Sequence, residues 1–195
     1  MPVEMSIWRL DQGLRAIEHS TLESEARLQE ALMSDLSIVS PQLMRIGDKV
    51  RTDHGKEIDI LAVDAEGTIA VVELKRNRTP RDVVAQAIDY ASWVQGLSYD
   101  DIAELFEEKN SGRAFEEAFD DHFGQSPPEE INERHKMIIV AVELDPDTER
   151  IIGYLSENHE VPINAVFFRY FKDGQAVYLT RTWLVDPAEA EANVD

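Results

Sequence analysis

The chain has 195 residues, of which 43% are hydrophobic and 30% charged, and its formal net charge is −20. This length predicts one globular domain over residues 1–195 with a real core. Cysteine is absent, which excludes disulfides and thiolate metal sites and fits a reducing, cytoplasmic setting. The longest apolar run, residues 137–142, is too short to cross a bilayer, and the first residues lack a signal-peptide pattern.

The negative charge is unevenly distributed along the chain. Residues 1–98 carry 11 Lys/Arg against 16 Asp/Glu, whereas residues 99–195 carry 8 against 23. The stretch 75–81 holds four basic residues and no acid. The overall charge opposes non-specific binding to nucleic acid, so we expect any affinity for DNA to be modest, salt-sensitive and dependent on local positive charge.

A first helix is predicted to open within residues 20–23, where Ser20 or Thr21 can cap it. Leucines at positions 22, 28, 32 and 36 form one stripe at helical spacing. Glu25 falls inside this stripe, where a carboxylate is costly unless it has a partner. Glu25 is therefore either a surface residue that bends out to water or an acid that reaches a site on the next strands.

Residues 43–52 predict a strand, with a bulge or bend at Gly47-Asp48. Its basic residues, Arg45, Lys49 and Arg51, form either a solvated face or contacts to phosphate. The strand leads through a turn at residues 53–56 into the most informative stretch of the chain.

Residues 57–75 predict a β-hairpin. Two apolar runs rich in β-branched residues, 58–63 and 69–74, flank a loop that ends at Gly67. A three-residue loop with Gly67 left-handed pairs Asp64 with Thr68 and places Asp59 opposite Glu73. Opposed residues have Cβ atoms roughly 4.5–5.5 Å apart, so two carboxylates there repel unless a proton, a basic partner or a cation offsets them.

Lys75 lies two residues beyond Glu73 and therefore projects from the same face of the strand. Two acids and a lysine on one face of a hairpin form a binding place for a divalent metal and a phosphate. A surface ion-pair cluster is the alternative that the spacing leaves open.

A second helix is predicted from Pro80 to Val94, with apolar residues at 83, 84, 87, 88, 91 and 94. Gln86 and Tyr90 are four residues apart and share another face. They can hold a carboxylate, a lysine or a phosphate near the hairpin, or they can be ordinary residues at the boundary of an amphipathic helix.

The second half of the chain predicts a helix-rich segment and then a sheet. We first expect two acidic helices, over 100–109 and 113–122, with phenylalanines 106, 115, 119 and 123 in the core. A strand over 137–144 and a helix over 149–158, capped by residues 145–148, follow. The last elements are strands over 163–171 and 176–185, joined by a turn at Asp173-Gly174, and a frayed tail over 186–195. The order of elements predicts an α/β/α fold with a central mixed β-sheet. The single domain then comprises a motif core over about 22–94, an acidic helical segment over about 99–134 and a C-terminal strand–helix–hairpin over about 136–185.

Four motifs follow one another in this order and together resemble a known superfamily. They are Glu25-x-x-Leu28-Gln29, Gly55-x-Glu57-Ile58-Asp59, Glu73-Leu74-Lys75 and Gln86-x-x-x-Tyr90. This arrangement resembles the PD-(D/E)XK, or restriction-endonuclease-like, nuclease superfamily, most closely the catalytic domain of NucS-type endonucleases. The leading Pro-Asp of the superfamily name is Ile58-Asp59 here.

The resemblance implies a role for each motif residue. Asp59 and Glu73 would bind Mg²⁺ or Mn²⁺, with the Leu74 carbonyl as an additional ligand. Glu25 would hold a metal-bound water or a second cation. Lys75 would act as an electrostatic and orienting group beside the attacking water rather than as the base. The two remaining polar residues of the motifs, Gln86 and Tyr90, would orient the nucleophile or touch the nucleic-acid backbone. Four arginines would contact nucleic acid: Arg51, Arg76, Arg78 and Arg81.

The implied function is a metal-dependent endodeoxyribonuclease that hydrolyses phosphodiester bonds in DNA, without a membrane partner. A homodimer would suit the cutting of two strands. The alternative is a nuclease-fold binding or interaction module without catalytic activity. The net charge of −20 favours this alternative, as does the expectation that no DNA-reading domain precedes the Glu25 helix.

Overall fold

The computed structural model describes residues 5–11, 13–20, 25–75, 81–142 and 145–187, except the side chains of residues 25 and 26. In chain order the elements are β1 (Ile7–Arg9), β2 (Arg15–Ser20), α1 (Glu25–Ser34), the 3-10 helix η1 (Leu36–Ile38), β3 (Met44–Arg51), β4 (Glu57–Val63), β5 (Ile69–Lys75), α2 (Asp82–Val94), α3 (Tyr99–Lys109), α4 (Phe115–Phe123), β6 (His135–Ala141), α5 (Pro146–His159), β7 (Ile163–Asp173) and β8 (Ala176–Trp183).

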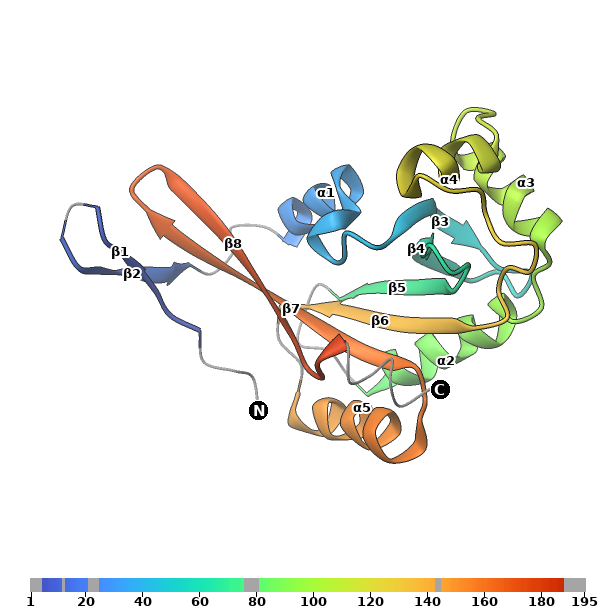
Figure 1. The fold of residues 1–195 in the computed structure, drawn as a ribbon. Helices are drawn as coiled ribbons and strands as arrows, with labels where there is room; N and C mark the ends of the chain where they lie inside the picture. The colour runs from blue at the N-terminus through green and yellow to red at the C-terminus, as the bar shows by residue number, and fades with distance from the viewer. Residues whose placement is uncertain (1–4, 12, 21–24, 76–80, 143–144, 188–195) are drawn as a thin grey trace.

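The strands of the described residues form one mixed sheet with the order β1-β2-β7-β6-β5-β4-β3, and β8 pairs with β7. Strands β5, β6 and β7 are parallel, whereas β3, β4 and β5 are joined by antiparallel pairs. Figure 1 shows α1 on one side of the sheet and α2 with α5 on the other. The predicted fold class, α/β/α with a central mixed sheet, is confirmed.

Each face of the sheet has its own core, because alternate strand residues point to opposite sides. On one face Val71 of β5 packs in a core with residues of α2, α3, α4 and α5. On the other face Val72 packs with the predicted leucine stripe of α1 and η1, Leu28, Leu32 and Leu36. Leu22, the first leucine of the predicted stripe, lies outside the described residues.

The packing of α1 gives a direct test of this second core. Leu32 is fully buried, and we expect Leu32→Ala to lower the free energy of unfolding by about 2–5 kcal/mol, because it leaves a cavity as well as removing apolar contact. The matched variant Leu14→Ala changes a side chain that is 78% exposed and should cost less than about 0.5 kcal/mol. Urea unfolding of both variants measures the difference, and equal costs would contradict the burial of the stripe.

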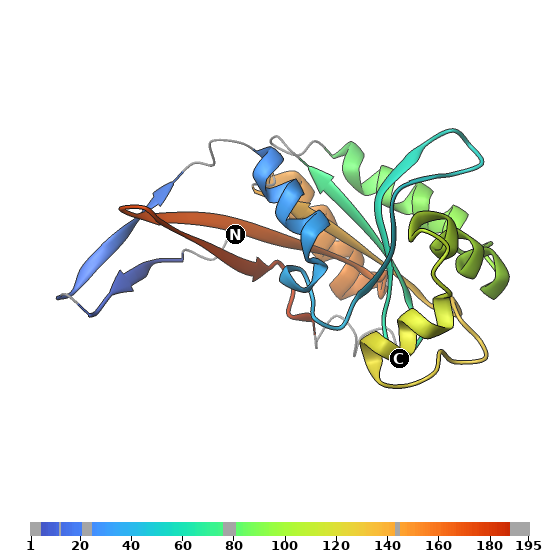
Figure 2. The ribbon, with the colours of Figure 1, turned by 90° about the horizontal axis from the view of Figure 1, so that it is seen from above.

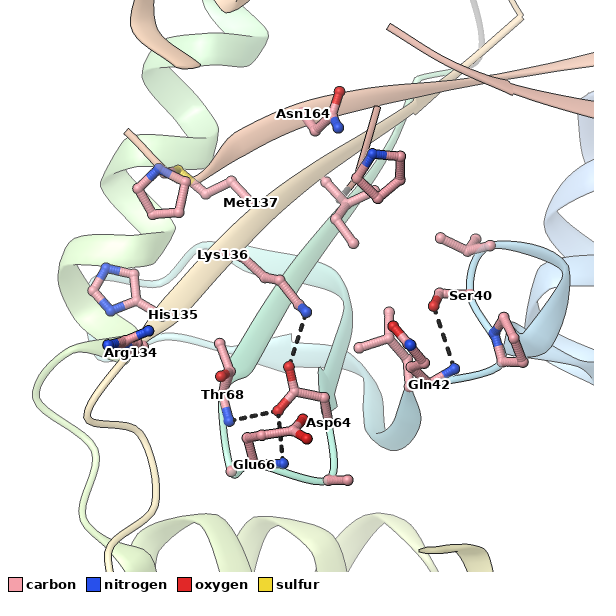
Figure 3. Close-up of a pocket in the computed structure, with 18 of the residues that line it drawn as sticks. Ser40, Gln42, Asp64, Glu66, Thr68, Arg134, His135, Lys136, Met137 and Asn164 are labelled. Atoms are coloured by element: carbon pink, nitrogen blue, oxygen red, sulfur yellow. Dashed lines mark hydrogen bonds and ion pairs between the residues drawn. The ribbon is translucent and has the colours of Figure 1, made fainter. Parts of the chain in front are cut away.

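The hairpin of β4 and β5 has the predicted register. The Asp64 N–H donates to the Thr68 carbonyl and the Gly67 N–H donates to the Asp64 carbonyl, each at 3.1 Å. Gly67 has a φ of 83°, the left-handed conformation that the three-residue loop requires. Figure 3 shows the Asp64 carboxylate holding this loop through the Thr68 and Glu66 N–H groups. The ladder runs from Val63–Ile69 to Ile60–Val72, so Asp59 and Glu73 are the next residues in line.

Two strands precede α1, where the sequence predicted no element. β1 and β2 form an antiparallel pair, and β2 also pairs with the distal part of β7. Arg9 and Arg15 both donate to Asp173 at the end of β7, at 2.9 and 2.8 Å. Most residues of β1 and β2 are exposed, so these strands lack the apolar alternation by which a half-buried strand is recognised.

Several element boundaries differ from the prediction. Helix α5 begins at Pro146, because Asp145 caps it by accepting from the Asp147 and Thr148 N–H groups. The β7–β8 turn consists of Gly174 and Gln175, since Asp173 pairs with Ala176. The irregularity of β3 is a register shift between Arg45 and Gly47, which lies just before the predicted position at Gly47-Asp48, because Gly47 and Asp48 pair regularly with Leu61 and Ile60.

Ile88 was predicted to lie on the apolar face of α2 but is 43% exposed. At about 100° of rotation per residue, Ile88 lies about 40° beyond the arc that the buried residues of α2 cover. Tyr90, at the other end of this arc, is 3% exposed instead. Phe123, predicted as core, is only partly buried, unlike Phe115 and Phe119. None of the described helices combines the length and hydrophobicity that a membrane crossing needs.

Candidate active site

The candidate site lies at the end of β5, on the face of the sheet that α2 covers. Glu73 and Lys75 alternate with Leu74, so they point to the face that carries Val71 and that α2 covers. Leu74 points to the opposite face and packs against the α1 core. Helix α2 therefore brings Gln86 to the side of the sheet on which Glu73 and Lys75 project.

A chain of hydrogen bonds fixes the Lys75 ammonium. Lys75 Nζ donates to Glu73 Oε1 and to Gln86 Oε1, both at 2.7 Å. Gln86 Nε2 donates to the Tyr90 hydroxyl, and that hydroxyl donates to the Glu57 carbonyl, again at 2.7 Å each. Three elements, β4, β5 and α2, thus set the position of one positive charge.

Asp59 lies beside Glu73, as the register of the hairpin predicted. Asp59 Oδ2 accepts the Leu74 N–H at 2.8 Å, which holds the carboxylate against the end of β5. The negative charge of Asp59 also acts on Glu73 and helps to raise the pKa of that carboxyl. The structure therefore brings together Asp59, Glu73 and Lys75.

Glu73 is the most strongly perturbed group of the site. It is only 3% exposed, and its Oε2 has no hydrogen-bond partner among the described residues. Burial has the largest effect on the pKa of Glu73 and raises this pKa. The hydrogen bond from Lys75 lowers the pKa, whereas the negative charge of Asp59 raises it. The resulting pKa is about 7, well above the usual 4.5.

A buried carboxylate oxygen without a partner is unfavourable, because desolvation is not repaid by a hydrogen bond. The chemistry of this donor set fits a hard divalent cation, which prefers oxygen ligands and keeps several waters. Among the described side chains, no group of three or more His, Asp or Glu residues is arranged to hold a metal ion. Asp59 and Glu73 would be two protein ligands of such a cation, and the side chain of Glu25 lies outside the described residues.

The other predicted site residues are placed as follows. Glu25 begins α1, and in Figures 1 and 2 this end of α1 lies on the side of the molecule where β5 and β6 end. Arg51 is exposed and pairs in register with Glu57, at the same end of the sheet. Arg81 forms an ion pair with Asp147 at 2.9 Å. Arg76 and Arg78 lie outside the described residues.

Two features of the site could not be read from the sequence. The Glu57 carbonyl anchors Tyr90, and a backbone acceptor has no residue type that could signal it. The Leu74 N–H that holds Asp59 is also a backbone group, so the residue type does not indicate it. Arg45, which was left open as a phosphate contact, donates to the Met33 carbonyl at 2.6 Å and so takes part in packing of the chain.

A cavity of about 1000 Å³ lies at the opposite end of the sheet, around the β4–β5 loop and the first residues of β6 and β7. In Figure 3 the Asp64 carboxylate and the Lys136 ammonium meet within it, at 2.8 Å. Its lining includes acidic and basic residues alike, such as Glu66, Glu133 and Arg134. The cavity is therefore separate from the carboxylates at the end of β5.

Comparisons with known proteins give structural likenesses only. No protein-family model matches the chain, and no curated protein matches it. Among solved structures, the chain is similar to a repair endonuclease from Pyrococcus abyssi, with 18% identity and a TM-score of 0.42 over 75% of this chain and 48% of that one. It is also similar to EndoMS, in a structure named as an EndoMS–dsDNA2 complex, with 20% identity and a TM-score of 0.43 over 78% of this chain and 49% of that one.

An apo form of EndoMS gives 17% identity and a TM-score of 0.40 over 82% of this chain and 62% of that one. The chain thus spans about half the length of the first two structures. These proteins are of the same kind as the enzymes that the sequence motifs resemble.

Proposed function

We propose that this protein is a Mg²⁺- or Mn²⁺-dependent nuclease that hydrolyses phosphodiester bonds in DNA. The observation that carries the proposal is the buried Glu73: its Oε2 has no hydrogen-bond partner in the described part of the chain, and Asp59 and Lys75 lie beside it. Two carboxylates that repel each other at the end of a strand are costly for the fold. A site that has to bind a cation gives a reason for this cost.

In this proposal Asp59 and Glu73 hold the cation through carboxylate oxygens, with Glu25 and the Leu74 carbonyl as further ligands. When bound, the cation supplies positive charge for the phosphate and lowers the pKa of water. Lys75 binds a non-bridging phosphate oxygen and stabilises the negative charge that develops there.

Gln86 and Tyr90 act on this step through Lys75. Gln86 Oε1 accepts from the ammonium, and Tyr90 fixes Gln86 because its own hydroxyl is tied to the backbone of β4. The pair removes rotational freedom from a long, flexible side chain before the substrate binds. Such preorganisation lowers the cost of reaching the transition state.

The second candidate function is a binding module with a nuclease-like fold and no activity. The net charge of −20 favours it, because this charge opposes the approach of DNA. The two readings differ in whether the carboxylates bind a cation. Calorimetric titration with Mn²⁺ separates them, since absence of binding would favour the module.

Cleavage of DNA tests the proposed function. Purified protein is incubated with single-stranded, duplex and branched DNA in the presence of Mg²⁺ or Mn²⁺. We expect cleavage that is lost when the cations are chelated, and that falls at least about a hundredfold in Asp59→Asn, because this change removes a charged ligand. The readout is the rate of product formation on a gel.

The matched control is Asp48→Asn, the same chemical change on β3, where Asp48 pairs in register with Ile60 rather than facing Glu73. This variant should cleave like the unaltered protein. Cleavage that persists in Asp59→Asn would come from a contaminating nuclease, and it would refute the proposed site.

A further inference from the structure

Strand β7 continues past the candidate active site. The parallel ladders place Lys75, Ala141 and Phe167 in one row across β5, β6 and β7. The last described residue of the β6 ladder is Ala141, whereas β7 runs on to Asp173. At about 3.3 Å per residue, this overhang extends roughly 20 Å beyond the row of Lys75.

The overhang is built into a projecting sheet. β8 pairs with it on one edge and β2 on the other, and β1 pairs with β2. We call this part, residues 5–11, 13–20 and 168–180, the β-arm. Figures 1 and 2 show the β-arm projecting from the end of the sheet towards which β5 and β6 point, which is the end that carries the candidate site.

The β-arm differs from the rest of the molecule in its charge. The whole chain has 19 Lys/Arg against 39 Asp/Glu, whereas the β-arm has four basic residues, Arg9, Arg15, Arg169 and Lys172, against three acids. One of these acids, Asp173, has a side chain that is only 6% exposed and lies against two arginines. The β-arm therefore carries a formal charge of +1 in an otherwise acidic protein.

The two faces of the β-arm follow from the alternation of β7. The face that carries Lys75 continues through Phe167 to Arg169, Phe171 and Asp173. The register places Tyr178 and His19 beside Phe171, and the hydrogen bonds place Arg15 and Arg9 beside Asp173.

We call the face of the β-arm that carries these residues the site face. The opposite face carries Lys172, Val177 and Glu18.

The site face combines the two kinds of group that bind single-stranded nucleic acid. Arg169 has no acidic partner among the described ion pairs, and Arg15 is 68% exposed although it contacts Asp173. Tyr178 is 43% exposed and presents a ring to solvent. Arginines that follow a backbone and aromatic rings on which bases stack are the usual elements of such a surface.

We propose that the site face of the β-arm binds a single-stranded segment of DNA and directs its backbone towards Lys75. Arg169 and Arg15 contact phosphates, and Tyr178 stacks on an unpaired base. This inference rests on the proposed nuclease function, because it assigns the partner from the position of the β-arm next to that site. It also explains how a protein with a net charge of −20 holds a polyanion.

Binding is measured without cleavage, by fluorescence anisotropy of a labelled single-stranded DNA of about 20 nucleotides in EDTA. Tyr178→Ala should raise the dissociation constant at least about fivefold, because one stacking contact is lost. Arg169→Ala should lower the slope of the affinity against salt concentration by about 0.7, the effect of one phosphate contact. Thermal unfolding of each variant confirms that it is folded.

The matched controls are Lys172→Ala and Val177→Ala, which make similar changes on the opposite face of the same two strands. Each should change the dissociation constant less than about twofold. The inference is overturned if Arg169→Ala and Lys172→Ala weaken binding equally, because only total charge would then matter. It is also overturned if the unaltered protein does not bind this DNA.

A second copy of the chain is the competing partner, since Trp8, Leu10 and Leu14 of the β-arm are exposed. Sedimentation that shows Tyr178→Ala separating a dimer, with DNA binding unchanged, would overturn the inference in favour of this partner. The proposed nuclease function fails by a different result, the absence of cation-dependent cleavage. Because binding is read in EDTA, the two failures are distinguishable.

Discussion

Replacing Lys75 by methionine is expected to lower the single-turnover rate of DNA cleavage about 10²–10³-fold. Methionine keeps the length and apolar stem of the side chain but removes the ammonium. Lys75 is the one residue that contacts both Glu73 and Gln86 in the described hydrogen bonds, so its charge lies at the centre of the site. Loss of this preorganised positive charge should destabilise the transition state more than the bound substrate, because negative charge develops on the phosphate in the transition state.

The matched control for this prediction is Lys56→Met. Lys56 forms an ion pair with Asp89 at 2.9 Å, and its side chain is 54% exposed. This variant should cleave at the unaltered rate. If Lys75→Met also cleaves at that rate, the lysine is part of a structural ion-pair cluster and the role assigned to it is wrong.

Titration of Glu73 is expected to make the protein less stable as the pH rises. In the folded protein the pKa of Glu73 is about 7, whereas the ordinary value is 4.5. Between these values the folded protein holds a proton that the unfolded chain has released. Raising the pH through this window therefore favours unfolding, by roughly 3 kcal/mol in total at most.

The measurement compares the unaltered protein with Glu73→Gln, in urea unfolding series without divalent cations. The stability of the unaltered protein relative to Glu73→Gln should fall between about pH 4.5 and about pH 7 and stay constant above. Glu66→Gln, which makes the same chemical change at an exposed position in the β4–β5 loop, serves as the control. A flat difference for Glu73→Gln would mean that folding leaves the pKa of Glu73 unchanged.

Cation binding gives this prediction a second arm. Above pH 7, Mn²⁺ should raise the unfolding midpoint of the unaltered protein, because a ligand that binds only the folded state stabilises that state. At a Mn²⁺ concentration one hundred times the dissociation constant, the free energy of unfolding should rise by about 2.7 kcal/mol. Glu73→Gln should lose this stabilisation. A rise of equal size in both proteins would place the cation elsewhere.

The hairpin was predictable because its signals are local. Gly67 fixes the loop, the loop fixes the register, and the register alone brings Asp59 next to Glu73. The same holds for Gln86 and Tyr90, whose spacing of four residues puts them on one side of a helix. The burial of Glu73 could not be predicted from the sequence, nor could the absence of a hydrogen-bond partner for its Oε2 among the described residues, since both depend on how α2 covers the sheet.

The β-arm was not predictable for the opposite reason. β1 and β2 are short and mostly exposed, so their residues follow no apolar period. They are strands because β7 offers β2 a partner edge, because β1 pairs with β2, and because Asp173 binds one arginine from each. The overhang of β7 itself depends on where β6 ends. Relations of this kind between distant segments leave no trace within a short window of sequence.

The contact between Arg9 and Asp173 joins residues that are 164 positions apart in the chain. During synthesis β1 and β2 leave the ribosome long before β7 exists, so they cannot dock until β7 has emerged as well. Contacts of such long range are slow to form, because the intervening loop has to close first. β1 and β2 are therefore expected to join the sheet after its other strands have paired, and a nascent protein that has not yet made β7 would lack the projecting arm altogether.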